Sequence, residues 1–124
     1  MQDSSPKVLI AEEDDRLRRI VRLNLEQGGF STTEAASLQE CELAIQRDHV
    51  ALVIVSSQLP DFDGPHFTQW LRSHFPLDPV PVVLVSFEPE DRLYTVPLKQ
   101  AAFERKPFDP EELVDQVTRL LHTA

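Results

Sequence analysis

The sequence predicts an α/β domain built on a doubly wound, five-stranded parallel sheet. Short apolar runs with strand character alternate with stretches whose apolar residues recur at helical spacing. Such alternation favours parallel strands joined by right-handed helical crossovers, with helices on both faces of the sheet. A chain of 124 residues suits one domain, and no repeat or composition shift divides it. We therefore expect a single domain over residues 1–124, with a flexible polar N-terminus at residues 1–6.

The first half of the chain contains two predicted strands and two predicted helices. Asp14 or Asp15 caps the first helix, because a short acidic side chain accepts hydrogen bonds from free backbone N–H groups. Gly28-Gly29 ends that helix, since glycine adopts the left-handed conformation at low cost. Ser37 caps the second helix, which buries an apolar stripe. The expected strands are Lys7–Ala11 and Phe30–Glu34, and the second helix covers Leu38–Arg47.

The second half is expected to supply three more strands and the last helix. The turn cluster at 60–64 precedes a helix over Pro65–Phe75. Asp109 caps the last helix, with Pro110 at its first position and acidic residues in its first turn, where the helix dipole favours them. The three strands are expected at Val50–Val55, Val82–Ser86 and Ala101–Glu104.

Charge and composition exclude several classes of protein. Twelve Lys and Arg residues against 21 Asp and Glu residues give a net charge of −9, which disfavours direct nucleic-acid binding. The single cysteine, Cys41, excludes an intramolecular disulfide framework. The apolar runs are far shorter than a membrane span, and the polar N-terminus lacks the apolar core of a signal peptide. We therefore expect a cytoplasmic domain without membrane or nucleic-acid contacts.

Polar residues follow the ends of four predicted strands. In parallel sheets of this kind the functional crevice lies at the carboxyl ends of the strands, so these residues are expected to meet there. Carboxylates suit a hard cation such as Mg²⁺, and a lysine with a hydroxyl suits a phosphoryl group. The residues are Glu12 to Asp15, Ser56 to Gln58, Ser86 and Lys106.

Four segments together resemble one known family. They are Val8–Asp14, Leu59–Gly64, Pro81–Ser86 and Lys106–Leu113. In order and in spacing they resemble the receiver domain of bacterial two-component response regulators, over nearly the whole chain. The resemblance implies a flavodoxin-like (βα)5 fold and a role in phosphorelay signal transduction.

The resemblance also implies roles for individual residues. Glu12 and Glu13 match the acidic pair that holds Mg²⁺. Ser86 matches the switch hydroxyl, Phe103 the switch aromatic residue, and Lys106 the lysine that pairs with the phosphoryl group. The family pattern further implies a cis peptide bond between Lys106 and Pro107.

The chain departs from the family at the phosphoacceptor. Counting back three residues from Leu59 reaches Ser56, where the family has aspartate. A serine hydroxyl needs a general base before it attacks phosphorus. Glu13 also replaces the usual aspartate, so Glu12, Glu13 and the carbonyl of Gln58 are expected to form a weak or lost Mg²⁺ site. Lys106 is then expected to pair with Glu12 or Glu13.

A second departure lies between Ser86 and Lys106. Pro89 and Pro97 bracket the segment where the family has its fourth helix, so that helix is expected to be short, displaced or irregular. The face of the fourth helix, fifth strand and last helix is the expected partner surface, for a signalling protein or a second copy. Its apolar candidates are Leu93, Tyr94, Val96 and Leu98.

Three functional hypotheses follow from these departures. The first is a pseudo-receiver, not an enzyme, that acts by phosphorylation-independent protein–protein interaction and needs no cofactor. The second is a working phosphoacceptor that uses Asp61, Asp63 or Ser56 with Mg²⁺. The third is a pocket that binds another small anion beside Lys106. The sequence leaves open the partner, the pathway, the oligomeric state and the conformational state, and whether the chain acts alone or within a larger regulator.

Overall fold

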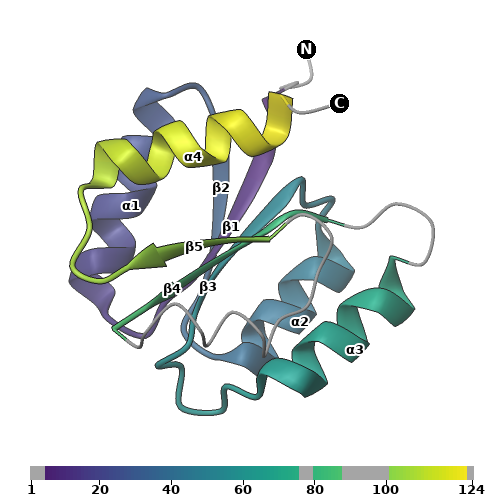
Figure 1. The fold of residues 1–124 in the computed structure, drawn as a ribbon. Coiled ribbons are helices and arrows are strands. Elements are labelled where there is room, and N and C mark those ends of the chain that lie inside the picture. The colour runs from purple at the N-terminus through teal and green to yellow at the C-terminus, as the bar shows by residue number, and fades with distance from the viewer. Residues whose placement is uncertain (1–4, 76–79, 88–100, 123–124) are drawn as a thin grey trace.

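The fold was analysed in a computed structural model, which describes residues 5–75, 80–87 and 101–122. Five parallel strands form one sheet in the order β2-β1-β3-β4-β5. The order reverses between β1 and β3, because β2 lies on one side of β1 and the later strands lie on the other (Figure 1). This is the predicted doubly wound, flavodoxin-like sheet. In such a sheet the crevice at the point of reversal is the expected ligand site.

The strands lie close to their predicted positions. The predictions for the first and fourth strands are confirmed, whereas β2 begins one residue later than expected and β5 ends one residue later. β3 begins at Leu52 rather than Val50 and ends at Ser56, because only from Val8↔Leu52 onward does it pair with β1. The strands are β1 (Lys7–Ala11), β2 (Ser31–Ala35), β3 (Leu52–Ser56), β4 (Val82–Ser86) and β5 (Ala101–Arg105).

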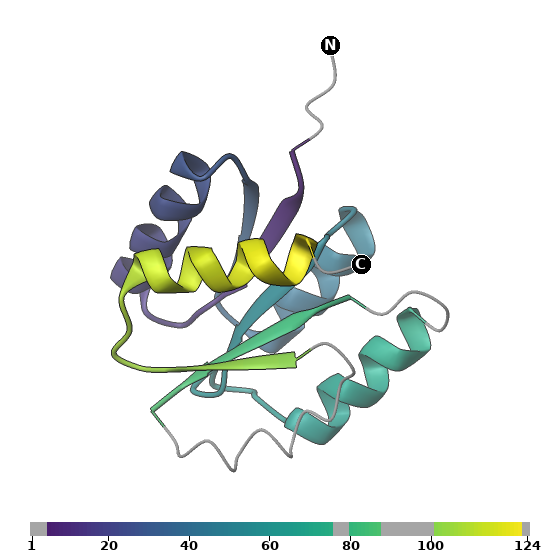
Figure 2. The same cartoon turned by 45° about the horizontal axis from the view of Figure 1, so that its top comes forward.

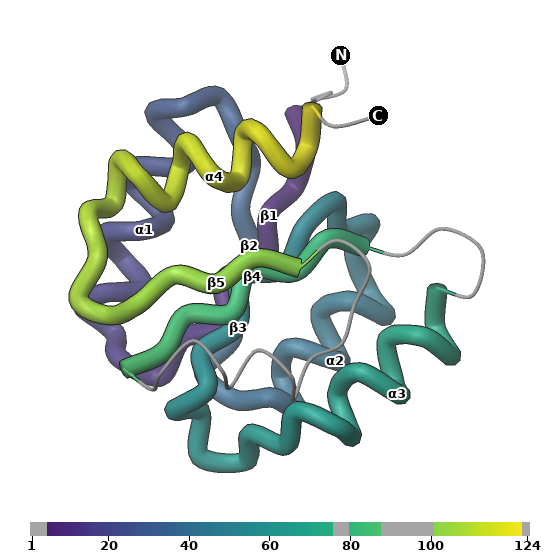
Figure 3. The backbone as a smooth tube through the Cα atoms, in the orientation of Figure 1, coloured from purple at the N-terminus to yellow at the C-terminus, as the bar shows by residue number. Residues whose placement is uncertain are grey.

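Four described helices cover the two faces of the sheet. Helices α1 and α4 lie side by side on one face, and α2 and α3 cover the other (Figures 1 and 2). The tube in Figure 3 shows the same pairing of α1 with α4 and the run of β5 alongside β4. The helices are α1 (Asp15–Gln27), α2 (Leu38–Arg47), α3 (Gly64–His74) and α4 (Pro110–His122).

Side chains at the helix ends explain where the helices begin. Asp14 caps α1 by accepting hydrogen bonds from the N–H groups of Arg16 and Leu17, and Ser37 caps α2. Asp63 caps α3, so this helix starts at Gly64, one residue before the prediction. After α1 the chain turns at Gly29, whose φ of 95° is accessible to glycine at little cost.

Alternate residues along the central strands pack into two apolar cores, one on each face of the sheet. In β1, Leu9 and Ala11 face α2 and α3, whereas Val8 and Ile10 face α1 and α4. Burial on both faces explains why these strands are continuously apolar. The predicted inner residues of α2, including Cys41, are buried, and Trp70 of α3 is partly buried against the same core.

Two expectations fall wholly or partly outside the described residues. The irregular fourth helix and its prolines belong to residues 88–100, and residues 1–4 of the predicted flexible N-terminus are also outside. Pro6 is described, and its carbonyl accepts a hydrogen bond from the Ser31 N–H. Among the described helices, none is long and apolar enough to span a membrane.

Candidate functional site at the carboxyl edge of the sheet

Lys106 lies at the centre of the polar residues that follow the strands. Its Nζ lies 2.8 Å from Glu12 Oε1, 3.3 Å from Glu13 Oε2 and 3.0 Å from Ser56 Oγ. These partners come from the ends of β1 and β3, whereas Lys106 follows β5. The Lys106 side chain is 2% exposed and that of Glu12 is 3% exposed. The sequence-predicted pairing of Lys106 with the acidic residues is therefore present, and the ion pair is buried.

The backbone around Lys106 fixes its place in the site. Its N–H donates to the carbonyl oxygen of Ser86 at 2.8 Å, which ties the end of β5 to the end of β4. The peptide bond between Lys106 and Pro107 is cis, as the family resemblance implied.

The two glutamates differ in their affinity for a proton. Burial raises the pKa of Glu12, and hydrogen bonds from Lys106 and from the Asp14 N–H oppose this rise without cancelling it. Burial acts in the same direction on Glu13. There, hydrogen bonds from its own backbone N–H and from the Ser56 hydroxyl outweigh burial and hold the pKa below its usual range. Glu13 is therefore the more readily ionised of the two.

The hydroxyls at the ends of β3 and β4 form a second cluster. Ser57 donates a hydrogen bond to Ser86 Oγ, and Gln58 Nε2 donates to both of these hydroxyls, at 2.9 Å and 3.3 Å. Ser56 Oγ accepts from the Gln58 backbone N–H at 3.1 Å. Ser56 and Ser86 are fully buried. Each serine therefore has a protein partner, as buried hydroxyls generally require.

Phe87 lies beside this site, whereas Phe103 lies within β5. Phe87 follows β4 directly, and Lys106 Nζ lies 5.5 Å from the centre of its ring. The Phe87 side chain is 59% exposed, so it covers one side of the ammonium while facing solvent. Phe103 on β5 is partly buried against the core shared with α2 and α3. The residue that matches the switch aromatic residue of the family therefore packs partly into the core.

Comparison with known proteins identifies the family of the chain. The model of the response regulator receiver domain matches residues 8–118. The chain belongs to this family. It is thus a receiver domain of two-component signal transduction.

The curated relatives of this receiver are transcriptional regulators. It is 27% identical over 126 residues to the transcriptional regulatory protein GltR of Pseudomonas aeruginosa, covering 100% of this chain and 52% of that protein. It is 31% identical over 120 residues to the transcriptional regulatory protein SrrA of Staphylococcus aureus, covering 94% and 48%. The chain therefore spans about half the length of these relatives.

Solved structures show the same fold at lower identity. A response regulator receiver protein from Sinorhizobium medicae superposes with a TM-score of 0.84 at 19% identity, covering 97% of each chain. An orphan response regulator of H. pylori superposes with a TM-score of 0.80 at 21% identity, covering 98% of this chain and 100% of the other. These likenesses establish the receiver fold.

The donor set in this receiver does not fit a magnesium ion. Mg²⁺ requires near-octahedral oxygen coordination, and position 56 offers a neutral hydroxyl. The Lys106 ammonium already contacts both carboxylates, which leaves Glu13 Oε1 as a buried oxygen without a hydrogen-bond partner. Within the described part of the chain, no three His, Cys, Asp or Glu residues cluster as metal ligands. One unpartnered oxygen beside a lysine is a poor metal site.

The proposed substitute acceptors of the receiver have structural partners. Asp61 accepts hydrogen bonds from the N–H groups of Leu38 and Gln39, at 2.7 Å and 3.0 Å, and so stabilises the start of α2. Asp63 caps α3 through the N–H of His66. Burial tends to raise the pKa of Asp61, but these backbone hydrogen bonds keep it below its usual range.

Sequence reasoning placed some residues correctly and missed others. Glu12, Glu13, Ser56, Ser86 and Lys106 all meet at the carboxyl edge, as predicted. The hydrogen bonds of Ser57 and of the Gln58 side chain, and the contact of Phe87 with Lys106, were not predicted. Their position directly after β3 and β4 was the available signal. The apolar candidates of the predicted partner surface lie outside the described residues; they are Leu93, Tyr94, Val96 and Leu98.

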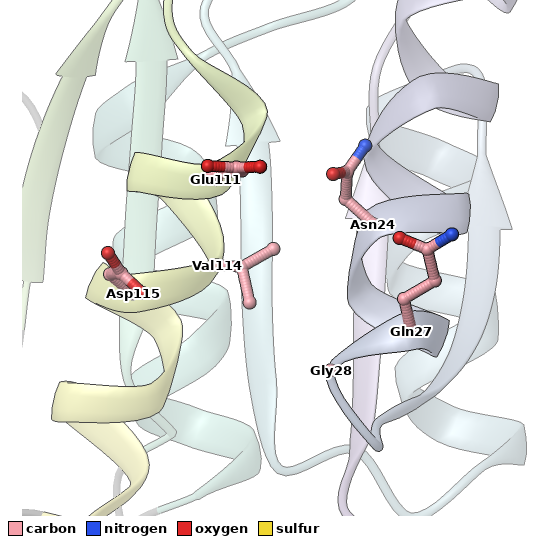
Figure 4. A pocket seen from close by; sticks show the side chains of 6 residues that line it. All are labelled: Asn24, Gln27, Gly28, Glu111, Val114 and Asp115. Carbon is pink, nitrogen blue, oxygen red and sulfur yellow. The ribbon is translucent and has the colours of Figure 1, made fainter.

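A separate hollow of about 290 Å³ lies between α1 and α4 of the receiver. Figure 4 shows Glu111 of α4 opposite Asn24 of α1, and Val114 of α4 projecting toward α1. None of its residues belongs to the carboxyl edge. They are Asn24, Gln27, Gly28, Glu111, Val114 and Asp115.

Proposed function

We propose that this receiver is a pseudo-receiver, which transmits a signal by phosphorylation-independent contact with another protein. We further propose that it has no enzymatic activity and acts in the cytoplasm. The observation that carries the proposal is the buried contact of Lys106 with Glu12 and with the hydroxyl of Ser56. In this chain the lysine that would meet a phosphoryl group is held by protein side chains.

The surroundings of Ser56 make it a poor nucleophile. Its oxygen accepts hydrogen bonds from Lys106 and from the Gln58 N–H, which withdraw electron density. A hydroxyl needs a general base to attack phosphorus. The Ser56 hydroxyl donates a hydrogen bond to the carboxylate of Glu13, which is therefore the candidate base. The pKa of Glu13 is lowered, and a carboxylate of lowered pKa is a weak base.

The alternative acceptors are disfavoured for a different reason. Each carboxylate of Asp61 and Asp63 already accepts backbone hydrogen bonds at the start of a helix. Phosphorylation there would disrupt those helix starts. A phosphoacceptor role for Asp61 or Asp63 would therefore destabilise the helix start that the residue holds.

Anion binding beside Lys106 is disfavoured because the N–H donors of its ammonium group already have partners. An ammonium group has three N–H donors. In this chain the two glutamates and Ser56 take up those donors. An incoming anion would have to displace one of these partners and would face two carboxylates.

A protein partner fits the remaining surface better than nucleic acid. The net charge of −9 opposes contact with phosphate backbones. The described part of the expected partner face consists of α4 and the edge strand β5, whose residues are partly buried or exposed. We propose that Leu93, Tyr94, Val96 and Leu98 complete this face, for a signalling protein or a second copy of the chain.

The first experiment measures whether the pocket senses a phosphoryl mimic. Two-dimensional NMR spectra are recorded with Mg²⁺ and then with beryllofluoride, for the wild type and for Ser56→Asp as the matched variant. We expect no saturable shift at Glu13, Ser86 or Lys106 in the wild type. Saturable wild-type shifts that spread to Phe103 would refute the proposal.

A mass measurement separates the second hypothesis from the first. The wild-type chain is incubated with acetyl phosphate and Mg²⁺, and its intact mass is compared with that of Asp61→Asn and Asp63→Asn. We expect no gain of a phosphoryl group in any sample. A gain in the wild type that one aspartate variant abolishes would establish an alternative acceptor.

The partner face is tested through self-association. Sedimentation of the wild type is compared with that of Leu93→Arg and Tyr94→Ala, with Leu43→Ala as an exposed control on α2. If a dimer forms through the proposed face, only the first two variants should weaken it. Equal dimerisation of all four proteins would exclude the proposed face as the dimer interface.

A further inference from the structure

The Gln58 side chain bridges hydroxyls from the ends of two strands. Its Nε2 donates to Ser57 Oγ at 2.9 Å and to Ser86 Oγ at 3.3 Å. Its Oε1 lies 3.5 Å from Ser56 Oγ. A primary amide has two N–H donors, so both are used within the pocket. Gln58 is only partly exposed, which agrees with a side chain turned toward the protein.

We propose that the Gln58 carboxamide is an internal ligand of the emptied pocket. It occupies the space between Ser56 and Ser86 and holds the Ser86 hydroxyl in one position. The inference rests on the proposed function, because a pocket that took up a phosphoryl group between these residues would need the same space.

The chemistry of the surrounding groups favours a neutral amide in this space. The charges of Lys106 and Glu12 compensate each other at 2.8 Å. What remains between β3 and β4 is a set of hydroxyls that need both donors and acceptors, which a carboxamide supplies. Removal of the Gln58 side chain should therefore leave a site for a small neutral amide such as formamide, rather than for an oxyanion.

The test is chemical rescue. Gln58→Ala is titrated with formamide, and the backbone signals of Ser57 and Ser86 are followed by two-dimensional NMR. We expect these signals to move on substitution, and to return in a saturable manner toward their wild-type positions as formamide is added. The same concentrations should leave the wild-type signals of these residues in place.

Two further variants serve as controls. Gln58→Met has a side chain of similar length without amide donors. It should shift the Ser86 signal as Gln58→Ala does, but it should not respond to formamide. Gln27→Ala, an exposed glutamine on α1, should change neither signal.

The outcomes separate this inference from the proposed function. Unchanged Ser57 and Ser86 signals in both Gln58 variants would overturn the inference. Absence of a saturable formamide response in Gln58→Ala, or an equal response in the wild type, would overturn it as well. Phosphorylation of the wild-type chain by acetyl phosphate would instead refute the proposed function, and it is detected by a different measurement.

Discussion

Two groups of ion pairs in this receiver have similar distances but different surroundings. At the carboxyl edge, Lys106 lies 2.8 Å from Glu12, and both side chains are nearly inaccessible to solvent. Between α1 and the edge strand β2, Arg18 lies 2.7 Å from Asp15 and 2.9 Å from Glu34, whose side chains are 85% and 38% exposed. The distance between the charged atoms therefore does not by itself determine how much an ion pair contributes to the stability of the fold.

The reason is the cost of leaving a charge without its partner. An exposed carboxylate that loses its arginine is hydrated by water, so such pairs contribute about 0–1 kcal/mol. A buried carboxylate that loses its lysine has no such substitute, and breaking a buried pair typically costs about 3–5 kcal/mol. We therefore expect the carboxyl edge to be sensitive to substitution and the α1 surface to be tolerant.

Removal of the Lys106 ammonium should give the largest effect. Lys106→Ala leaves Glu12 and Glu13 side by side without a cation and should lower the free energy of unfolding by about 3–5 kcal/mol. Urea unfolding at neutral pH measures this loss. Lys7→Ala is the control, with an expected change within about 0.5 kcal/mol. A loss below about 1 kcal/mol for Lys106→Ala would contradict the role of burial.

Removal of the Ser56 hydroxyl should give an intermediate effect. Ser56→Ala deprives Lys106 and the partly buried Gln58 N–H of an acceptor, at a cost of about 1–3 kcal/mol. Ser73→Ala on the exposed side of α3 should be close to neutral by the same urea measurement. Equal stability of the two variants would show that the hydroxyl is dispensable.

The charge of Glu12 should appear as a dependence of stability on pH. The folded-state pKa of Glu12 is raised, chiefly by burial, above the value of 4.5 expected for the unfolded chain. Its contribution to stability is therefore complete below pH 4.5 and is lost as the pH rises through the folded-state pKa. Glu12→Gln removes this titration.

The unfolding free energies of wild type and Glu12→Gln should then diverge with pH. From acid toward neutral pH, the difference between them should move in favour of the variant. Urea unfolding at a series of pH values measures this difference. Parallel pH profiles of the two proteins would contradict the raised pKa.

The α1 surface should give the smallest effect. Glu34→Gln weakens the contacts with Arg18 and Arg22 and should cost about 0.5 kcal/mol or less. Added salt should reduce this cost further, because exposed charges are screened. A cost as large as that of Lys106→Ala would remove the distinction between the two groups of ion pairs.

Most of the fold could be predicted because its signals are local. Continuous apolar runs marked the central strands, and Asp14 and Ser37 cap the helices for which they were predicted. The start of β3 was misplaced because Val50 is buried just before the ladder begins, and burial alone does not reveal pairing. Residues that pack without pairing resemble strand residues in sequence.

The site was predicted at the level of residues but not of contacts. The position of Glu12, Ser56, Ser86 and Lys106 after strands was sufficient to bring them to one edge. The bridging of Ser57 and Ser86 by Gln58 was not predictable, because it depends on side-chain directions at the ends of β3 and β4. Those directions are set by the pairing of the two strands.

The sequence by itself determined the alternation of strands and helices, the edge at which the polar residues gather, and the presence of a serine at position 56. Each of these is a matter of local pattern or of residue identity. Only the tertiary structure decided which partners Lys106 has and how Gln58 lies among the hydroxyls. Lys106 is 94 positions from Glu12 and 50 from Ser56 in the chain, so their contact exists only once β1, β3 and β5 share one sheet. Burial in that sheet is what turns an ordinary ion pair into the feature on which the proposed function depends.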